Sequence, residues 1–373
     1  MELSVVIPCL NEIETIEICI NKCKLAIRKM NIKAEIIVAD NGSDDGSAEL
    51  AKKLGAKIVN IKDKGYGNAL RGGIEAAIGK YIIMADCDNS YNFLDIDKFY
   101  YKLKGGFDIV QGCRFPVGGG KIEENAMPIS HQYIGNPFFS FLSKLFFSLP
   151  FNDVYCGFRG FDRLKFLKLK HFSSGMVFAI ENLIKFKVSG ANCAEIPVTL
   201  SKDGRKMNKS HLNTISDGWS TLRFLMITCP KWLFFFPSII FFIISLFYLY
   251  QTSRLILIDL ETGLSENILL FIFYFIISFQ IFMFGLFSSL MAVKLKMLKS
   301  KFVDVFFKIF KLRYAFYLSF CIILTLYFLN IFKDDYSIIQ KFFEIFFYSS
   351  LMFLVLLIIN SLYVSLITLD ENF

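Results

Sequence analysis

The sequence predicts an α/β domain with a mostly parallel sheet and helices on both faces, followed by an α-helical transmembrane domain. Strand-like apolar runs alternate with helical patterns over roughly the first 230 of the 373 residues. From Leu233 to Leu369 the chain is almost entirely apolar, and this part carries much of the 54% hydrophobic content and many of the 44 phenylalanines. Polar side chains also gather where the predicted strands end.

Five short apolar runs are the predicted strands, and a turn and a helical pattern follow most of them. They are residues 3–7, 34–40, 56–61, 80–85 and 107–113. Pro8 is expected to stop the first strand, and Asn11 to cap a helix whose isoleucines are spaced for one face. In a sheet of parallel strands, ligands bind beyond the carboxyl ends of the strands.

Two Asp-x-Asp pairs show that position decides which carboxylates are a candidate site. Asp86 and Asp88 directly follow the strand 80–85. Asp95 and Asp97 have the same spacing but open an amphipathic helical pattern, where acidic residues favour the helix N-terminus. The first pair is therefore a metal-site candidate, and the second pair is expected to be structural.

Other polar residues follow the remaining predicted strands. They are Pro8, Asn11 and Glu12 after the first strand, Asp40, Asn41 and Asp44 after the second, and Arg114 after the fifth. Any one of them also fits an ordinary turn. Their joint placement predicts one ligand crevice at this edge of the sheet.

Four apolar blocks predict membrane-spanning helices rather than buried core helices. Residues 233–250, 268–293, 315–332 and 345–369 each approach or exceed the ~20 residues that cross a bilayer. The start "MELSVVIPCLNE" does not resemble a signal peptide. Seven basic residues between 294 and 313 oppose one acidic residue, so this linker is expected in the cytoplasm, together with residues 1–230 and the C-terminus.

Charge and cysteine usage narrow the classes of partner. The net charge of +8 suits an anionic membrane surface and anionic substrates. The sequence of the predicted α/β domain contains no basic stripe interleaved with aromatic residues, so nucleic-acid binding is the weaker interpretation. The nine cysteines form no Cys-x-x-Cys pair, and the three histidines are far apart. Reduced structural thiols are therefore expected, and a zinc site is not.

Ordered motifs carry a resemblance to a known family. "VVIPCLNE", "IIVADNGSDDGS", "KGYGNALRGGIEAAIGKYIIMADCDNSY" and "DIVQGCRF" resemble inverting family 2 glycosyltransferases of the GT-A fold. "DVYCGFRGF" and "EIPVTLSKDGRKMNKSHLNTISDGWSTLRFLM" are similar to polyprenyl-phosphate glycosyltransferases of the dolichyl-phosphate mannose and glucose synthase type. The resemblance covers about residues 3–232. It implies a nucleotide-sugar donor with a UDP- or GDP-linked hexose, and a polyprenyl-phosphate acceptor in the membrane.

The resemblance also implies roles for the donor-side residues. Nucleoside and cofactor binding would fall to Pro8, Asn11, Glu12, Asp40 and Arg71. Asp86 and Asp88 would bind Mg²⁺ or Mn²⁺ on the diphosphate, because these cations prefer hard oxygen ligands. Ser90 stands where related synthases often place Gln, which puts a third protein ligand in doubt.

An ionised lipid phosphate can attack the sugar without a general base, but its position must be set by cations. Arg114, Arg159, Arg205 and Lys209 are the expected cations, and Asp153 and Glu181 the acidic candidates. Val177 replaces a glutamate of close bacterial relatives, so an acidic role there would pass to Glu181.

The expected organisation is a GT-A domain over 1–212, a juxtamembrane interfacial helix over 213–232 and a four-helix transmembrane domain over 233–373. The aromatic segment 136–151 is also expected at the membrane interface, with core packing as the alternative.

Two other functions fit parts of the sequence. A processive polysaccharide synthase would share the N-terminal motifs but needs a Gln-x-x-Arg-Trp motif, and neither Trp219 nor Trp232 follows an arginine. A non-catalytic membrane scaffold or transport partner with a retained fold is the second alternative, since four spans exceed what an anchor needs.

Overall fold

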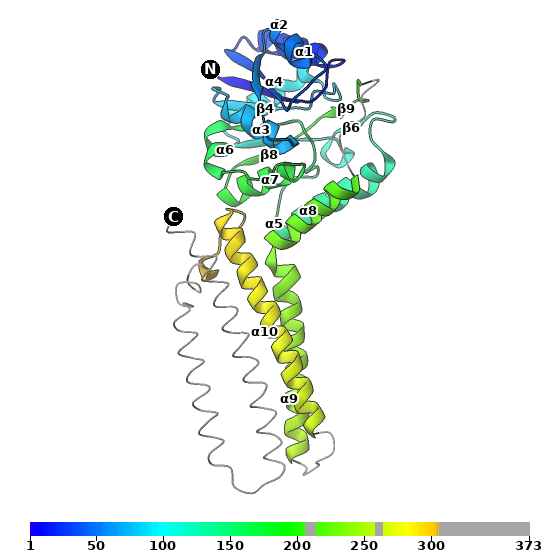
Figure 1. Ribbon diagram of the computed structural model, residues 1–373, viewed down its shortest axis with the longest axis vertical. Helices are drawn as coiled ribbons and strands as arrows, with labels where there is room; N and C mark the ends of the chain where they lie inside the picture. The colour runs from blue at the N-terminus through cyan, green and yellow to red at the C-terminus, as the bar shows by residue number, and fades with distance from the viewer. Residues whose placement is uncertain (206–213, 258–263, 304, 306–373) are drawn as a thin grey trace. The chain divides into compact units, whose positions relative to one another are not determined.

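The computed structural model describes residues 1–205, 214–257, 264–303 and 305 (Figure 1). The chain divides into two compact units, Met1–Leu225 and Met226–Phe373. The predicted juxtamembrane segment 213–232 contains α8 (Thr214–Thr228), and the division between the units falls inside that helix.

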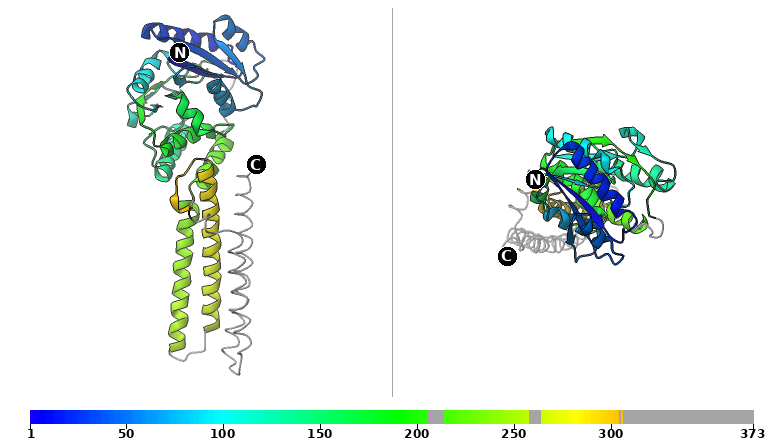
Figure 2. Two further views of the ribbon diagram at one scale, coloured as in Figure 1. Left: turned by 90° about the vertical axis from the view of Figure 1, so that its left-hand side faces the viewer. Right: turned by 90° about the horizontal axis from the view of Figure 1, so that it is seen from above.

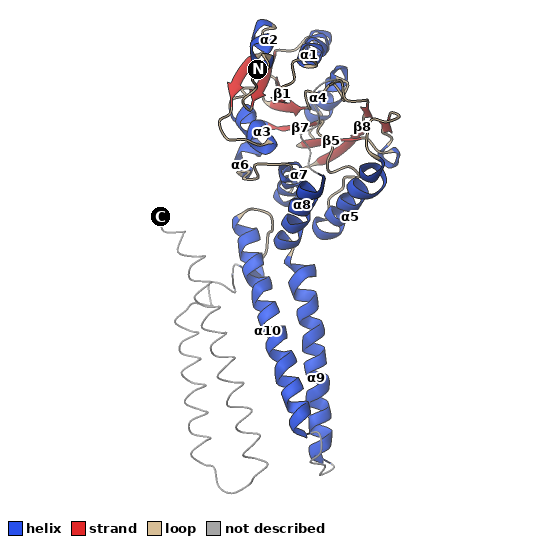
Figure 3. Ribbon diagram, turned by 45° about the vertical axis from the view of Figure 1, so that its right-hand side comes forward, coloured by secondary structure: helices blue, strands red, loops and turns tan. Residues whose placement is uncertain are grey.

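A seven-stranded sheet forms the centre of the first unit, in the order β3-β2-β1-β4-β7-β5-β8 (Figure 3). Its strands are β1 (Leu3–Cys9), β2 (Ala34–Asp40), β3 (Lys57–Asn60), β4 (Tyr81–Met84), β5 (Ile109–Cys113), β7 (Arg159–Asp162) and β8 (Cys193–Pro197). Within this sheet β7 alone runs antiparallel to its neighbours. The parallel strands therefore present their carboxyl ends at one edge, as the sequence predicts. Two short strands, β6 (Lys121–Ile122) and β9 (Thr199–Leu200), pair separately.

Helices cover both faces of the sheet, because alternate strand residues are apolar on each side. The helices of this unit are α1 (Ile16–Met30), α2 (Ser47–Lys53), α3 (Tyr66–Glu75), α4 (Ile96–Lys104), α5 (Asn136–Phe147), α6 (Arg163–Leu169) and α7 (Val177–Ser189). Leu3, Val5 and Ile7 pack into the core beside α1 and α4. Val6 points to the other face, where Gly73 lets α3 approach closely.

The first loop differs from its prediction in two respects. β1 continues through Pro8 to Cys9, because β1 pairs with β4 only as far as Val6 and the missing N–H of Pro8 disrupts no ladder there. Asn11 does not cap α1: it lies in the left-handed region with φ 59°, and the helix begins five residues later at Ile16.

The second unit contains two long apolar helices, α9 (Phe236–Leu257) and α10 (Leu264–Lys294), which run alongside each other in Figure 1 and in the left view of Figure 2. Segments 231–255 and 266–294 are long and apolar enough to cross a membrane. Ser238 and Ser278 each donate a hydroxyl hydrogen bond to the other's carbonyl oxygen, at 3.0 and 2.8 Å. Such reciprocal bonds suit helices packed in an apolar medium. The predicted spans 315–332 and 345–369 lie outside the described residues.

Helix α5 has an inverted pattern of exposure. Its buried side chains are Ser140 and Ser143, whereas Phe138 is 46% and Phe141 61% exposed. Packing of these phenylalanines in the core is therefore ruled out, and Trp219 on α8 is likewise 62% exposed. The interfacial role of both helices stays a prediction.

Phe158 is the aromatic centre of the core between β7 and α4. Its ring is 1% exposed and stacks on Phe99 with a centroid distance of 4.2 Å. We expect Phe158→Ala to cost about 3–5 kcal/mol of stability, because the cavity would be only partly refilled. Thermal unfolding in detergent measures the loss. The half-exposed Phe138→Ala is the matched control and should change the midpoint little; equal shifts would contradict this assignment.

Candidate functional site

The parallel strands bring the predicted polar residues to one edge of the sheet. Glu12 lies beyond β1, Asp40 is the last residue of β2, Asp86 and Asp88 follow β4, and Arg114 follows β5. The second Asp-x-Asp pair lies at a helix N-terminus, as predicted. Asp95 and Asp97 begin α4, and Asp95 pairs with Lys98 at 2.8 Å.

Asp86 is fixed between two other segments of the chain. The Tyr66 hydroxyl at the start of α3 donates to Asp86 Oδ1 at 2.9 Å. Gly157 approaches so closely that a side chain at this position would collide with the Asp86 carboxylate. Burial, and then the charge of Asp88, raise the pKa of Asp86 to about 6. Because two nearby carboxylates with little access to water repel each other, a cation bound between them would be favoured.

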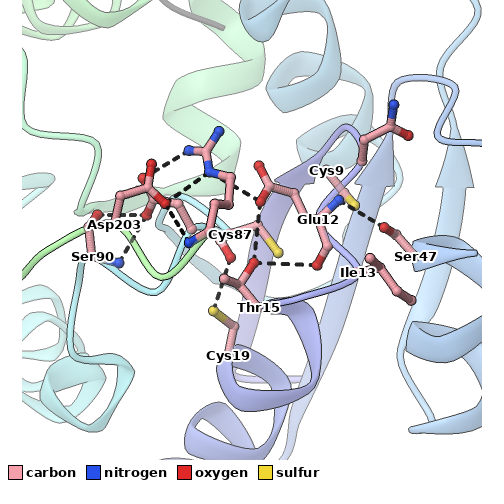
Figure 4. Close-up of polar contacts among 12 residues, drawn as sticks. Cys9, Glu12, Ile13, Thr15, Cys19, Ser47, Cys87, Ser90 and Asp203 are labelled. Atoms are coloured by element: carbon pink, nitrogen blue, oxygen red, sulfur yellow. Dashed lines mark hydrogen bonds and ion pairs between the residues drawn. The ribbon is translucent and has the colours of Figure 1, made fainter. Parts of the chain in front are cut away.

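Arg205 is the cation that meets this cluster of carboxylates. Its Nη2 lies 3.2 Å from Asp88 Oδ2, and its Nε lies 3.0 Å from Asp203 Oδ1 and 3.5 Å from Glu12 Oε2. Burial chiefly raises the pKa of Glu12 to about 7, with Asp88 and Asp203 adding to the shift and Arg205 opposing it. Figure 4 shows Glu12, Ser90 and Asp203 gathered in this one cluster.

The residues present fit a divalent cation. Mg²⁺ in proteins commonly uses one or two carboxylates together with substrate phosphates. Asp86 and Asp88 supply such a pair. Among the described residues no group of three or more His, Cys, Asp or Glu side chains is arranged to hold an ion, so further ligands would have to come from a donor and water. Ser90 donates its hydroxyl to Asp88 Oδ1 at 2.6 Å, which makes it a support of Asp88.

The donor-side loops are joined by hydrogen bonds. Asp40 accepts the N–H groups of Gly42 and Ser43, and Asn11 Oδ1 accepts the N–H of Asp44 at 2.9 Å. The bonds to Asp40 close the loop after β2, and the Asn11–Asp44 bond holds the loop after β1 against it. Carboxylate and amide oxygens with remaining lone pairs can accept a nucleobase N–H.

Arg114 and Asp153 form a buried bidentate ion pair. Arg114 Nε and Nη2 lie 2.6 and 2.9 Å from the two oxygens of Asp153, and the Arg114 N–H also donates to Asp153 Oδ2. Asp153 is fully buried, which contradicts its expected direct contact with substrate. Asp153 could therefore influence a substrate only through Arg114.

Arg159 and Glu181 also lie in the interior rather than in the crevice. Arg159 donates to the carbonyl oxygens of Val154, Cys156 and Ala179. Both residues are fully buried, so neither can reach a lipid phosphate or a sugar in this structure. Their hydrogen bonds to backbone groups hold neighbouring segments of the chain in place.

Glu181 organises the chain that supports Tyr66. It pairs with Lys185 at 2.7 Å and accepts the N–H groups of Phe172 and Ser173. Ser174, the next residue, accepts the N–H of Asn68 in α3 at 3.2 Å. The buried pair therefore holds the loop that packs against the first turn of α3.

Arg71 and Lys209 are the remaining predicted site residues. Arg71 donates to His171 O at 3.1 Å and to Asn68 Oδ1 at 2.8 Å, and it lines a cavity of ≈ 250 Å³ with Glu75 and Lys170. It is thus brought to the α6–α7 connection, which argues against its expected nucleotide contact. Lys209 lies outside the described residues.

Sequence reasoning missed Tyr66, Asp203 and the β8 residue Glu195. Tyr66 and Asp203 stand next to motif glycines, which is the signal that could have found them. Glu195 lies within β8 and gave no signal, because the sequence pattern of this short strand indicates only that it is a strand.

The fold and the acidic strand-end site define a GT-A domain of the glycosyltransferase class. The profile described as "Glycosyl transferase family 2" matches residues 4–169. The low-salt glycan biosynthesis hexosyltransferase Agl6 of Haloferax volcanii is 30% identical over 293 residues, covering 77% of this chain and 68% of that protein. The dolichyl-phosphate hexose transferase of the same organism is 29% identical over 166 residues, covering 44% of this chain and 69% of the relative.

This chain belongs to glycosyltransferase family 2. Among solved structures, glucosyl-3-phosphoglycerate synthase of Mycobacterium tuberculosis is similar with a TM-score of 0.49 and 20% identity, covering 61% of this chain and 80% of that one.

His171, in the loop held by Glu181, generates a pH prediction. Burial lowers its pKa well below the usual 6.5, and the charges of Lys185, Arg159 and Arg71 act in the same direction. Below about pH 6.5 the unfolded chain takes up a proton that the folded domain refuses. Stability should therefore fall by up to about 1.4 kcal/mol per pH unit as the pH drops from 6.5 toward the folded pKa.

His171→Gln, which keeps a polar side chain beside Asn182, should reduce this slope. Unfolding of both proteins is followed between about pH 5 and 7.5. Identical slopes for the two proteins would show that the imidazole does not remain neutral in the fold.

Proposed function

We propose that this protein transfers a hexose, glucose or mannose, from a UDP- or GDP-linked donor to a polyprenyl phosphate at the cytoplasmic face of a membrane, with inversion. The observation that carries the proposal is the strand-end cluster, where Asp86 and Asp88 lie beside Arg205 and the Arg114–Asp153 pair. The similarity to a dolichyl-phosphate hexose transferase supports the choice of acceptor.

The chain's own residues would divide the work between the two substrates. Asp40 and Asn11 would accept hydrogen bonds from the nucleoside, and Arg114 and Arg205 would orient phosphate oxygens. An oxygen of the acceptor phosphate forms a bond to the anomeric carbon while the bond from that carbon to the donor diphosphate breaks. Since the attacking oxygen is already ionised, no proton has to be removed. Mg²⁺ or Mn²⁺ held by Asp86 and Asp88 would supply charge neutralisation on the diphosphate.

The second unit and α5 support the proposed membrane location. The two long apolar helices fit membrane spans, and the exposed phenylalanines of α5 with Trp219 of α8 fit the headgroup region.

A donor screen tests the whole proposal: purified protein is incubated with Mg²⁺ or Mn²⁺, a polyprenyl phosphate and each of several UDP- and GDP-hexoses. Absence of any lipid-linked hexose would refute it, and longer glycan products would favour a processive synthase.

The two Asp-x-Asp pairs supply a matched test of the metal role. Replacing Asp86 and Asp88 by Asn should lower turnover at least about 100-fold, the effect expected when a preorganised electrostatic group is lost. The same change at Asp95 and Asp97 should leave turnover within about twofold. Lipid-linked product is the measurement. Wild-type turnover after replacement of Asp86 and Asp88 would instead support a role that needs no metal.

Arg205 should compete with the cation for Asp88. We expect Arg205→Gln to raise Mn²⁺ affinity about tenfold without nucleotide, equivalent to about 1.4 kcal/mol. Free Mn²⁺ is measured by electron paramagnetic resonance. Lys22→Gln is the control: it also removes one positive charge near this turn, but Lys22 donates to Asn89 Oδ1 at 2.8 Å and not to a carboxylate. Equal effects of the two variants would mean that only net charge matters.

A further inference from the structure

Gln111 and Glu195 face each other across the β5–β8 ladder and both bond to Asp153. The two residues are direct partners in the parallel register. Gln111 Nε2 donates to the carbonyl oxygen of Asp153 at 2.8 Å, and the backbone N–H of Asp153 donates to Glu195 Oε1 at 3.2 Å. The peptide groups on both sides of Asp153 are therefore held by one rung of the sheet.

Glu195 also fixes the residue before Asp153. Its Oε1 accepts the N–H of Asn152 at 2.7 Å, and its Oε2 accepts the Asn152 side-chain amide at 2.6 Å. Gln111 extends the clamp in the other direction, because its Nε2 also donates to Cys156 O at 3.0 Å. A rigid sheet thus sets the path of the loop from residue 152 to residue 156.

The consequence reaches Arg114 through the buried pair. Asp153 takes Nε and Nη2 of Arg114, and its carboxylate also accepts the Arg114 N–H. Nη1 takes no part in this fork. With Asp153 held at its N–H, its carbonyl and its carboxylate, the guanidinium plane is set as well. A fork of this kind loses its geometric specificity when its carboxylate is free to shift.

We infer that Gln111 and Glu195 are positioning residues that aim Arg114 Nη1 at a phosphate oxygen of a substrate. This inference rests on the proposed function, since it assumes a phosphate-bearing ligand at the end of β5. Two sources present the same chemistry, the donor diphosphate and the lipid monophosphate. The closing experiment separates them.

Glu195→Ala removes the clamp, and Glu195→Gln keeps one acceptor oxygen for the two backbone N–H groups. Asp108→Asn is the matched control at the opposite end of β5, where Asp108 accepts the N–H of Asn192 at 2.9 Å. Binding of farnesyl phosphate, and separately of UDP and GDP with Mn²⁺, is titrated in detergent without turnover. Thermal unfolding of each variant is recorded in parallel.

We expect Glu195→Ala to weaken the binding of one of these ligands on the order of tenfold, as loss of a supporting contact does in other charged sites. Arg114→Lys should weaken the binding of the same ligand, and both variants should bind the other ligand with wild-type affinity. Glu195→Gln should recover most of the affinity, and Asp108→Asn should bind both ligands as the wild type does.

The inference is overturned if Glu195→Ala binds both ligands like Asp108→Asn, or if all variants lose affinity in proportion to stability. If the wild type binds the phosphates but transfers no hexose, and Glu195→Ala weakens binding of one ligand as expected, the proposed function fails while the positioning role stands. If the wild type transfers hexose and Glu195→Ala matches the control, the proposed function stands and this inference fails.

Discussion

The ion pairs of Arg205 with Asp88, Asp203 and Glu12 are the interaction on which the strand-end site depends. Glu12 and Asp88 are largely out of water, and burial, followed by repulsion from Asp88, raises the pKa values of Glu12 and Asp86. One guanidinium compensates groups from three separate segments. A substrate-bound cation would meet the same demand, and the site would then exchange one positive charge for another.

Behind this cluster lies a second layer of charges that are paired and buried. Arg114 with Asp153 and Glu181 with Lys185 are buried pairs that supply geometry more than net stability. One pair sets the end of β5. The other holds the loop beside α3, and Tyr66 of α3 in turn bonds Asp86. The positions of Arg114 and Asp86 therefore depend on the fully buried side chains of Asp153 and Glu181.

The apolar surfaces follow a different physical rule from the core. In the core, Phe158 and Phe99 stack out of water, whereas α5 buries serines and exposes phenylalanines. An exposed aromatic stripe is stable where its rings meet a headgroup region. The long apolar helices of the second unit satisfy their hydroxyls internally through Ser238 and Ser278, as an apolar medium requires.

Local pattern determined much of this protein from the sequence alone: five strands of the sheet, the two long apolar helices, and the placement of Asp86 and Asp88 at a strand end while Asp95 and Asp97 open a helix. These features depend on periodicity and on parallel strands ending together. Tertiary structure alone decided that Asp153, Arg159 and Glu181 are buried supports, that Arg71 turns toward His171, and that Glu195 clamps Asp153. Burial and pairing depend on contacts between residues tens of positions apart, and the type of a side chain does not reveal which partner will neutralise it.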